Sequence, residues 1–315
     1  MKRLLNTLYV TSGNKYLSLE GENIVVLEDQ KEIGRVPLHN LQAIVTFGYT
    51  GASPALMGVC AQRNIDLSFM SGNGRFLARV TGEVKGNVTL RKQQYRISDN
   101  QEESIRIARN FILGKVYNSR WILERAIRDY SMRLDVETIK KKSLFLDQSI
   151  GKIRVCENAD ELLGLEGEAA SVYFSVFDDL ILQQKEDFYF HGRNKRPLLD
   201  NVNAMLSFGY SLLAGMCGGA LEAVGLDPYV GFFHTDRPGR MSLALDLMEE
   251  FRCVMVDRFV LTLINKRIMK PEYFLTKENG AVIMTEEGRK AFLSAWQGKK
   301  QEMITHPSLG EKIEW

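Results

Sequence analysis

The hydrophobic periodicity of the chain changes near residue 103, and this change limits the possible folds more than any other feature. Before it, short β-prone runs such as NIVVLE (23–28), LQAIVTF (41–47) and FLARV (76–80) are separated by turn-forming stretches. After it, apolar residues recur at helical spacing, first over residues 105–123. The pattern predicts an α+β protein of two domains, a β-rich N-terminal domain followed by an all-α C-terminal domain.

We place the β-rich domain at residues 1–93 and the helical domain at 104–300. Residues 94–103 lack apolar periodicity and are expected to be a linker, and residues 301–315 a loosely held polar tail. One helix is expected within the first domain, after the N-cap Ser53 and Pro54. Further helices are expected at about 159–184, 197–224, 241–268 and 284–298.

The charge and the cysteines limit the class of protein. With 41 Lys and Arg against 39 Asp and Glu, the net charge of +2 gives no global excess that announces nucleic acid. The four cysteines lie far apart without a CxxC pair, which argues against a zinc ribbon or a disulfide framework. No signal peptide or membrane span is evident. We therefore expect a cytoplasmic protein that does not associate with membranes.

Two acids lie on an apolar stripe in the helix expected at 241–268. Steps of three and four give Asp246, Glu249, Cys253, Val256 and Val260, and the lower part of this stripe is apolar. Like charges at this spacing lie about 5–6 Å apart and repel each other. If the stripe is buried, this repulsion indicates that Asp246 and Glu249 have a specific role. Alternatively, acids near a helix start simply favour the helix dipole and solvent.

A third acid, Glu166, lies on another apolar stripe, between Leu162 and Tyr173. Gly164 and Gly167 flank it, and each weakens the helix by roughly 1 kcal/mol relative to alanine while allowing a close approach to the backbone. A carboxylate in this position needs a partner, which could be an arginine or a bound cation.

His234 by itself is more typical of a packed or capping residue, and its significance comes from these acids. One imidazole with two or three carboxylates makes an oxygen-rich site that suits Mg²⁺ or Mn²⁺ better than zinc. Such a site activates a water or hydroxyl and neutralises charge on a phosphodiester. Arg237 and Arg240, in a Pro/Gly turn beside His234, are suited to hold phosphate, although surface solvation is the alternative.

Four stretches resemble the CRISPR-associated adaptation integrases, the "Cas-one" family, along nearly the whole chain. They are GLEGEAASVYF (164–174), RPLLDNVNAMLSFGYSLL (196–213), GLDPYVGFFHTDRPGRMSLALDLMEEFR (225–252) and, more loosely, VPLHNLQAIVTFG (36–48). Together these matches are far more specific than a single short motif. The resemblance implies an N-terminal β domain for dimerisation and partner contacts, and a helical catalytic domain.

The same resemblance implies the site and the reaction. The catalytic metal ligands fall on Glu166, His234 and Glu249, and Asp246 matches a neighbouring acid that could be an alternative ligand or could support one. Members vary between Asp and Glu at the position of Glu249. The family inserts short DNA fragments into the CRISPR array by attack of a 3′-hydroxyl on a phosphodiester.

The resemblance also implies the partners of the protein. It implies double-stranded and branched DNA as substrates, a homodimer, and a small ferredoxin-like partner called "Cas-two". Two other functions stay open at this point. One is a metal-dependent nuclease that cleaves branched DNA in repair, and the other is a DNA-binding scaffold whose acids are structural. The repair nuclease differs from the integrase in its nucleophile, which is water rather than a DNA 3′-hydroxyl.

Overall fold

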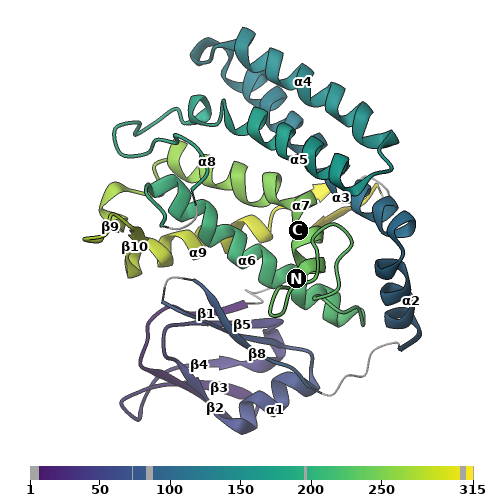
Figure 1. The fold of residues 1–315 in the computed structure, drawn as a ribbon. Helices are drawn as coiled ribbons and strands as arrows, with labels where there is room; N and C mark the ends of the chain where they lie inside the picture. The colour runs from purple at the N-terminus through teal and green to yellow at the C-terminus, as the bar shows by residue number, and fades with distance from the viewer. Residues whose placement is uncertain (1–6, 73, 83–87, 195–196, 306–309, 315) are drawn as a thin grey trace. The chain divides into compact units, whose positions relative to one another are not determined.

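The computed structural model describes residues 7–72, 74–82, 88–194, 197–305 and 310–314 (Figure 1). The chain divides into two compact units. The first comprises residues 1–84, 268–275 and 283–315, and the second comprises residues 85–267 and 276–282. The β-rich N-terminal region and the helical region that follows it confirm the expected α+β class.

Two four-stranded sheets form most of the first unit. In one sheet the order is β1-β5-β7-β8, with β1, β5 and β7 parallel and β8 antiparallel to β7. In the other the order is β4-β3-β2-β6, where β2, β3 and β4 are antiparallel neighbours. The strands are β1 Thr7–Val10, β2 Lys15–Glu20, β3 Asn23–Glu28, β4 Lys31–Pro37, β5 Ala43–Phe47, β6 Gly51–Ala52, β7 Asp66–Met70 and β8 Phe76–Val80.

Helix α1 (Pro54–Gln62) connects the two sheets in sequence. Ser53 caps it, accepting a hydrogen bond from the backbone N–H of Leu56 at 3.2 Å, and Pro54 occupies the first turn, as predicted. Leu56 and Cys60 on its buried face join the hydrophobic core of the unit, which the strands complete with Leu17, Ile24, Ile44 and Leu67.

Strand β4 is absent from the expectation. It is an edge strand, and most of its side chains are exposed, including Ile33. Only Val36 of this strand packs against the hydrophobic core, and a strand with so few buried side chains shows no clear apolar alternation, so periodicity could not reveal it.

The C-terminal segments of the first unit are η5 (Pro271–Tyr273), α9 (Glu286–Lys300), β11 (Met303–Thr305) and β12 (Lys312–Glu314). Two short strands, β9 (Phe274–Thr276) and β10 (Val282–Met284), form a separate two-stranded sheet. Within the unit, Gln297 of α9 donates to the Thr7 carbonyl at 3.0 Å, and Ser12 donates to Glu286 at 2.7 Å. The division therefore differs from the predicted boundaries, which placed residues 268–300 with the helices.

The residues of the expected polar tail contain β11 and β12, which pair in antiparallel register. Residues 306–309 and 315 lie outside the described part of the chain.

The second unit consists of helices packed around α3. This helix packs against α4, α5 and α7, while α6 packs against α7 (Figure 1). The helices are α2 Val88–Asp99, α3 Gln101–Tyr130, α4 Val136–Val155, α5 Ala159–Phe174, α6 Asn201–Ala223, α7 Ser242–Arg252 and α8 Arg258–Asn265, with a π-helical turn, η4, at Cys253–Asp257.

Three expectations for this unit need correction. Residues 94–103 were predicted to be a linker, but residues 94–99 belong to α2 and residues 101–103 to α3. The buried Gln94 accounts for this order, because its side chain donates to the carbonyls of Asp227 and Val230 at 2.8 and 2.9 Å. The structure also contains α4, which was not expected, and α5 ends at Phe174 rather than near residue 184.

Helix α6 is long and apolar enough to cross a membrane by length and composition alone. However, most of it is buried inside the structure, and this pattern is typical of a core helix.

Candidate metal centre

Asp246 and Glu249 lie on the buried face of α7. Asp246 is completely buried and Glu249 is 5% exposed, while Cys253, Val256 and Val260 below them are buried as well. The stripe therefore faces the interior as predicted, and the alternative of two acids that simply face solvent is wrong.

Two cations neutralise Glu249. Arg252, one turn further along α7, donates through Nη1 to both carboxylate oxygens, at 3.0 and 3.1 Å. The Lys115 ammonium of α3 lies 2.5 Å from Oε2. Burial raises the pKa of Glu249, but Arg252 and Lys115 outweigh this effect and lower it to about 2. Glu249 is therefore a carboxylate at any physiological pH.

Glu166 shares the same lysine. Its Oε1 accepts a hydrogen bond from the Lys115 ammonium, and its side chain is 17% exposed. Leu162, Ala169 and Tyr173 on the same face of α5 are buried, which confirms the predicted stripe. The two acids therefore come from α5 and α7 and meet at one ammonium from α3.

The two glycines that flank Glu166 do not lie against another part of the described chain, although the sequence suggested a close approach to the backbone there. Apart from its chain neighbours and the backbone of its own helix, a Cβ added at Gly164 or Gly167 would meet no described atom within 4 Å, and both residues are exposed. No other part of the described chain packs closely against α5 at these two positions, so neither glycine serves a close helix contact.

Asp246 orients His234. One oxygen, Oδ1, contacts Nδ1 of His234 at 2.6 Å and accepts from its backbone N–H at 2.9 Å. The other oxygen, Oδ2, accepts from the backbone N–H groups of Phe232 and Phe233 at 2.7 and 2.9 Å. Because a carboxylate accepts but does not donate, this contact favours the tautomer with the proton on Nδ1. The lone pair of Nε2 is then available to a ligand.

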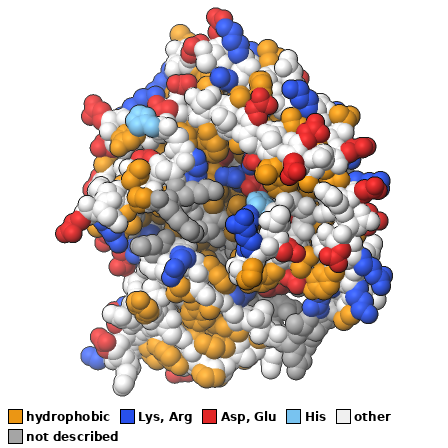
Figure 2. Space-filling view, in the orientation of Figure 1, with side chains coloured by type: hydrophobic (Ala, Val, Ile, Leu, Met, Phe, Trp, Pro, Cys, Tyr) orange, Lys and Arg blue, Asp and Glu red, His pale blue; other side chains and the backbone are white. Residues whose placement is uncertain are grey.

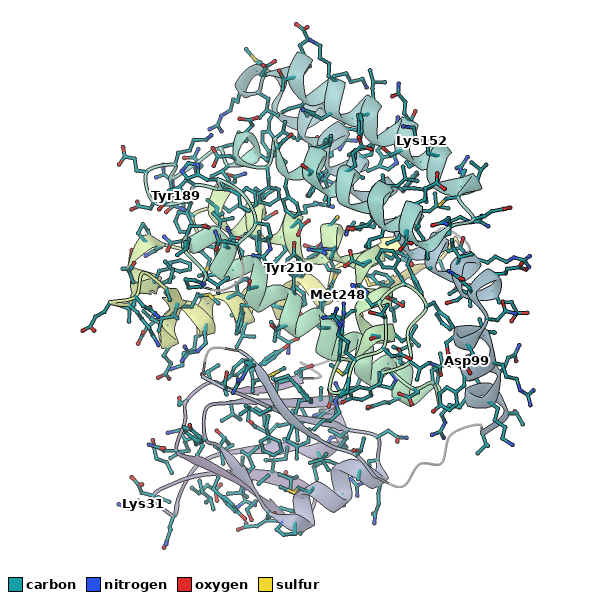
Figure 3. All side chains as sticks on the ribbon, in the orientation of Figure 1. Lys31, Asp99, Lys152, Tyr189, Tyr210 and Met248 are labelled. Atoms are coloured by element: carbon teal, nitrogen blue, oxygen red, sulfur yellow. The ribbon has the colours of Figure 1, made fainter. Side chains whose placement is uncertain are left out.

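A buried polar cluster lies behind Glu249. The Arg252 guanidinium packs over the Tyr210 ring at 4.4 Å, and Arg193 lies over the same ring at 5.2 Å. The Tyr210 hydroxyl donates to the buried Asp257, which belongs to the π-helical turn. Figure 3 labels Tyr210 on α6 and Met248, the neighbour of Glu249, on α7. This cluster fixes Arg252, so Arg252 holds Glu249 in one orientation.

The arginines near His234 are less constrained. Arg237 is exposed and Arg240 is half-buried, and a turn joins them through a 3.0 Å bond from the Arg240 N–H to the Arg237 carbonyl. On the face that Figure 2 shows, basic side chains are interspersed with acidic ones. The contact of Arg237 and Arg240 with phosphate stays a prediction.

The structure thus brings the predicted residues together in two pairs. Glu166 and Glu249 meet at Lys115, and His234 meets Asp246. Among the described residues, no three His, Cys, Asp or Glu side chains form a cluster ready to hold a metal ion. The donor chemistry nevertheless fits a hard divalent cation, because two carboxylates already converge on one positive charge.

Lys115 and Arg252 were not anticipated, although both leave a signal in the sequence. Lys115 lies three residues after Ile112 on the apolar stripe of α3, and it is 6% exposed. Arg252 follows Glu249 at the (i, i+3) spacing of helical ion pairs.

Comparison with known proteins gives consistent matches over almost the entire chain. The model of the family described as "CRISPR associated protein Cas1" matches residues 8–298. A CRISPR-associated endonuclease Cas1 of Rhodospirillum rubrum is 49% identical over 315 residues, covering 99% of this chain and 91% of the relative. Another, from Chlorobaculum tepidum, is 46% identical over 313 residues with the same coverage of 99% and 91%.

Solved structures agree in fold. A Cas1 protein from Thermotoga maritima superposes with a TM-score of 0.79 at 25% identity, covering 93% of this chain and 89% of that one. A casposase bound to its integration product superposes with a TM-score of 0.83 at 24% identity, covering 98% and 86%. The second similarity concerns the fold alone.

Proposed function

Because this chain belongs to the CRISPR-associated Cas1 family, we propose that it is a divalent-metal-dependent DNA endonuclease and integrase that acts in CRISPR adaptation. The relatives named above are endonucleases by name. The observation that carries the proposal is the convergence of Glu166 and Glu249 on one cationic position, with an oriented imidazole on the α7 side.

In this proposal Glu166, His234 and Glu249 hold the metal. A bound Mg²⁺ or Mn²⁺ would neutralise charge on the phosphodiester and activate the attacking hydroxyl. Arg252 keeps the Glu249 carboxylate ionised and oriented, and Asp246 keeps the proton of His234 on Nδ1. All four oxygen contacts of Asp246 go to the His234 loop, which favours a supporting role over direct ligation.

The substrate is double-stranded or branched DNA. Its phosphates would lie along the turn that carries Arg237 and Arg240, next to His234. The reaction is transesterification: the 3′-hydroxyl of the incoming fragment attacks a phosphodiester of the repeat, and a 3′-hydroxyl of the cut strand leaves. Attack by water on the same bond gives hydrolysis, so one site serves as integrase and endonuclease.

The assembly is a homodimer with a small Cas2 partner, and the protein acts in the cytoplasm. A solved complex titled "Cas6-RT-Cas1--Cas2 complex" contains a chain with this fold, at a TM-score of 0.80 and 21% identity. The β-rich N-terminal domain provides the dimer and partner contacts in this proposal.

The experiment that tests the function uses purified protein on branched DNA that carries a free 3′-hydroxyl at the junction. Products are followed with manganese and with chelator. Metal-dependent rejoining of the strands supports the integrase. Metal-dependent cleavage without rejoining would instead favour a plain nuclease, and metal-independent binding without either reaction would favour a scaffold.

The variants for this experiment are Glu166→Ala, His234→Ala and Glu249→Ala, each of which should abolish strand transfer while leaving DNA binding intact. Glu168→Ala is the matched control, because Glu168 is exposed on the same helix two residues from Glu166. Full activity in a folded variant removes that residue from the proposed site.

A further inference from the structure

The Lys115 ammonium occupies the position where the two site carboxylates meet. It contacts Oε1 of Glu166 and lies 2.5 Å from Oε2 of Glu249. The lysine comes from α3, which packs against both α5 and α7. Three helices that are distant in sequence therefore contribute one cation and two anions to a single, largely buried point.

Each of these three charges is stabilised by the opposite charge beside it. A buried lysine is costly unless it is paired, and two neighbouring carboxylates repel each other unless a cation lies between them. Lys115 has 7% of its side chain exposed and Glu249 also 7%. The ammonium thus provides the compensation that a bound cation would otherwise provide.

Arg252 has a different position. Both of its contacts to carboxylate oxygens are with Glu249, and its guanidinium packs over Tyr210 at 4.4 Å. Arg252 can keep Glu249 in place when Oε2, the oxygen that Lys115 also contacts, changes partner. Lys115, by contrast, has a flexible four-carbon stem and carries a compact charge that can move away.

We propose that Lys115 is an internal counter-cation of the metal site, which holds Glu166 and Glu249 in place without metal and is displaced when a divalent cation binds them. This inference rests on the proposed function, since it takes both acids as metal ligands. An ammonium and a divalent cation repel each other, and they compete for the same oxygens. The wild-type site therefore binds metal more weakly than its ligands alone would allow.

Neutral substitution of Lys115 should consequently change two properties in opposite directions. Without metal, the carboxylates lose their shared partner, so the chelator-treated variant should melt at a lower temperature. With metal, no competitor remains, so Mn²⁺ should bind at least about tenfold more tightly, because breaking a charge-assisted hydrogen bond opposes binding by that much or more. A purely structural role for Lys115 would lower stability without increasing the affinity for metal.

The experiment compares full-length wild-type protein with Lys115→Met and Lys115→Gln after removal of metal with EDTA. Mn²⁺ alone is titrated by calorimetry, and melting temperatures are recorded with and without Mn²⁺. The methionine variant keeps the apolar stem, and the glutamine variant retains an amide donor so that it folds if the first does not. Lys141→Met is the matched control, because Lys141 pairs with Glu137 on the exposed surface of α4 at 2.7 Å.

We expect tighter Mn²⁺ binding and a larger Mn²⁺-induced rise in melting temperature for both Lys115 variants, and neither change for Lys141→Met. The variant Glu166→Gln distinguishes a failure of the proposed metal site from a failure of the inference about Lys115. If it leaves the Mn²⁺ affinity unchanged, the proposed metal site is wrong and the inference with it. If it abolishes binding while the Lys115 variants bind Mn²⁺ no more tightly than wild type, the inference alone is wrong.

Discussion

Asp246 binds His234 twice through the same oxygen, once at the ring nitrogen Nδ1 at 2.6 Å and once at the backbone N–H at 2.9 Å. One carboxylate therefore fixes both the backbone and the imidazole of the residue. Because Asp246 is completely buried on α7, it connects the loop of His234 to the helix that carries Glu249.

The first prediction concerns the substitution Asp246→Asn. It replaces one acceptor oxygen by an NH₂ group that must face a donor, so we expect a loss of about 1–3 kcal/mol in the free energy of unfolding. Metal affinity should fall roughly 10- to 100-fold, because the imidazole loses its orienting partner. Urea denaturation and Mn²⁺ titration measure the two effects.

Asp236→Asn is the control for this prediction, since Asp236 is exposed in the same loop and contacts the Gly231 N–H only at 3.4 Å. Equal losses of metal affinity in both variants would contradict a specific role for Asp246.

The second prediction concerns Arg252→Met. Removing one partner of a buried ion pair leaves the other poorly compensated, at a cost of about 3 kcal/mol or more in the free energy of unfolding. Arg125→Met removes an exposed (i, i+4) pair with Asp129 and should cost less than about 1 kcal/mol. Chemical denaturation of the two variants compares them directly, and similar costs would show that Arg252 does not stabilise the buried carboxylate.

The third prediction concerns the cysteines, which are all free and buried in the structure. Burial raises the pKa of the Cys217 thiol to about 12, and burial together with Asp66 raises that of Cys60 to about 11. Because the thiolate is the reactive form and appears only as the pH approaches the pKa, native protein at pH 8.5 should react very slowly with a thiol reagent.

Labelling should become fast for all four thiols in urea. Ser171→Cys places a thiol at an exposed position of α5 and should react at once in the native protein. Rapid labelling of Cys217 without urea would indicate that α6 opens locally.

Helical periodicity identified the two acids of the candidate site, because Glu166 and Glu249 each interrupt an apolar stripe. The same reasoning applied to α3 would have found Lys115, which falls between Ile112 and Ser119 on the buried face. It could not have identified the partner, since Glu166 lies 51 residues away and only tertiary packing brings the two together.

The errors in the predicted fold occur where no buried apolar stripe marks the element in the sequence. Strand β4 is exposed, and α2 is held by a polar residue, Gln94, that hydrogen-bonds to a distant loop. Local apolar patterns carry no information on either. The position of α9 with the first unit is likewise a matter of tertiary contacts, such as that of Gln297 with the Thr7 carbonyl.

The last prediction concerns Gly114, the residue before Lys115. A Cβ added there would lie 2.7 Å from Cγ and 3.3 Å from Cβ of Glu250 on α7, so the helices must move apart or the side chain must shift. Glycine in a helix normally costs roughly 1 kcal/mol relative to alanine. At Gly151 on α4, where nothing lies within 4 Å, Gly151→Ala should therefore raise the free energy of unfolding by up to about that amount. Gly114→Ala should instead lower it by about 1–3 kcal/mol, as overpacking does.

This close approach also has a consequence for the site. Because α3 contacts α7 at Gly114 and Glu250, the next residue on α3, Lys115, reaches the preceding residue on α7, Glu249. Gly114→Ala should thus displace α7, and Glu249 with it, from α3 and from Glu166 on α5, which packs against α3. The two acids would then be misplaced relative to each other, so strand transfer on branched DNA should weaken, whereas Gly151→Ala should leave it unchanged. If Gly114→Ala proves as stable and as active as Gly151→Ala, Glu250 moves aside freely and the contact does not position the site.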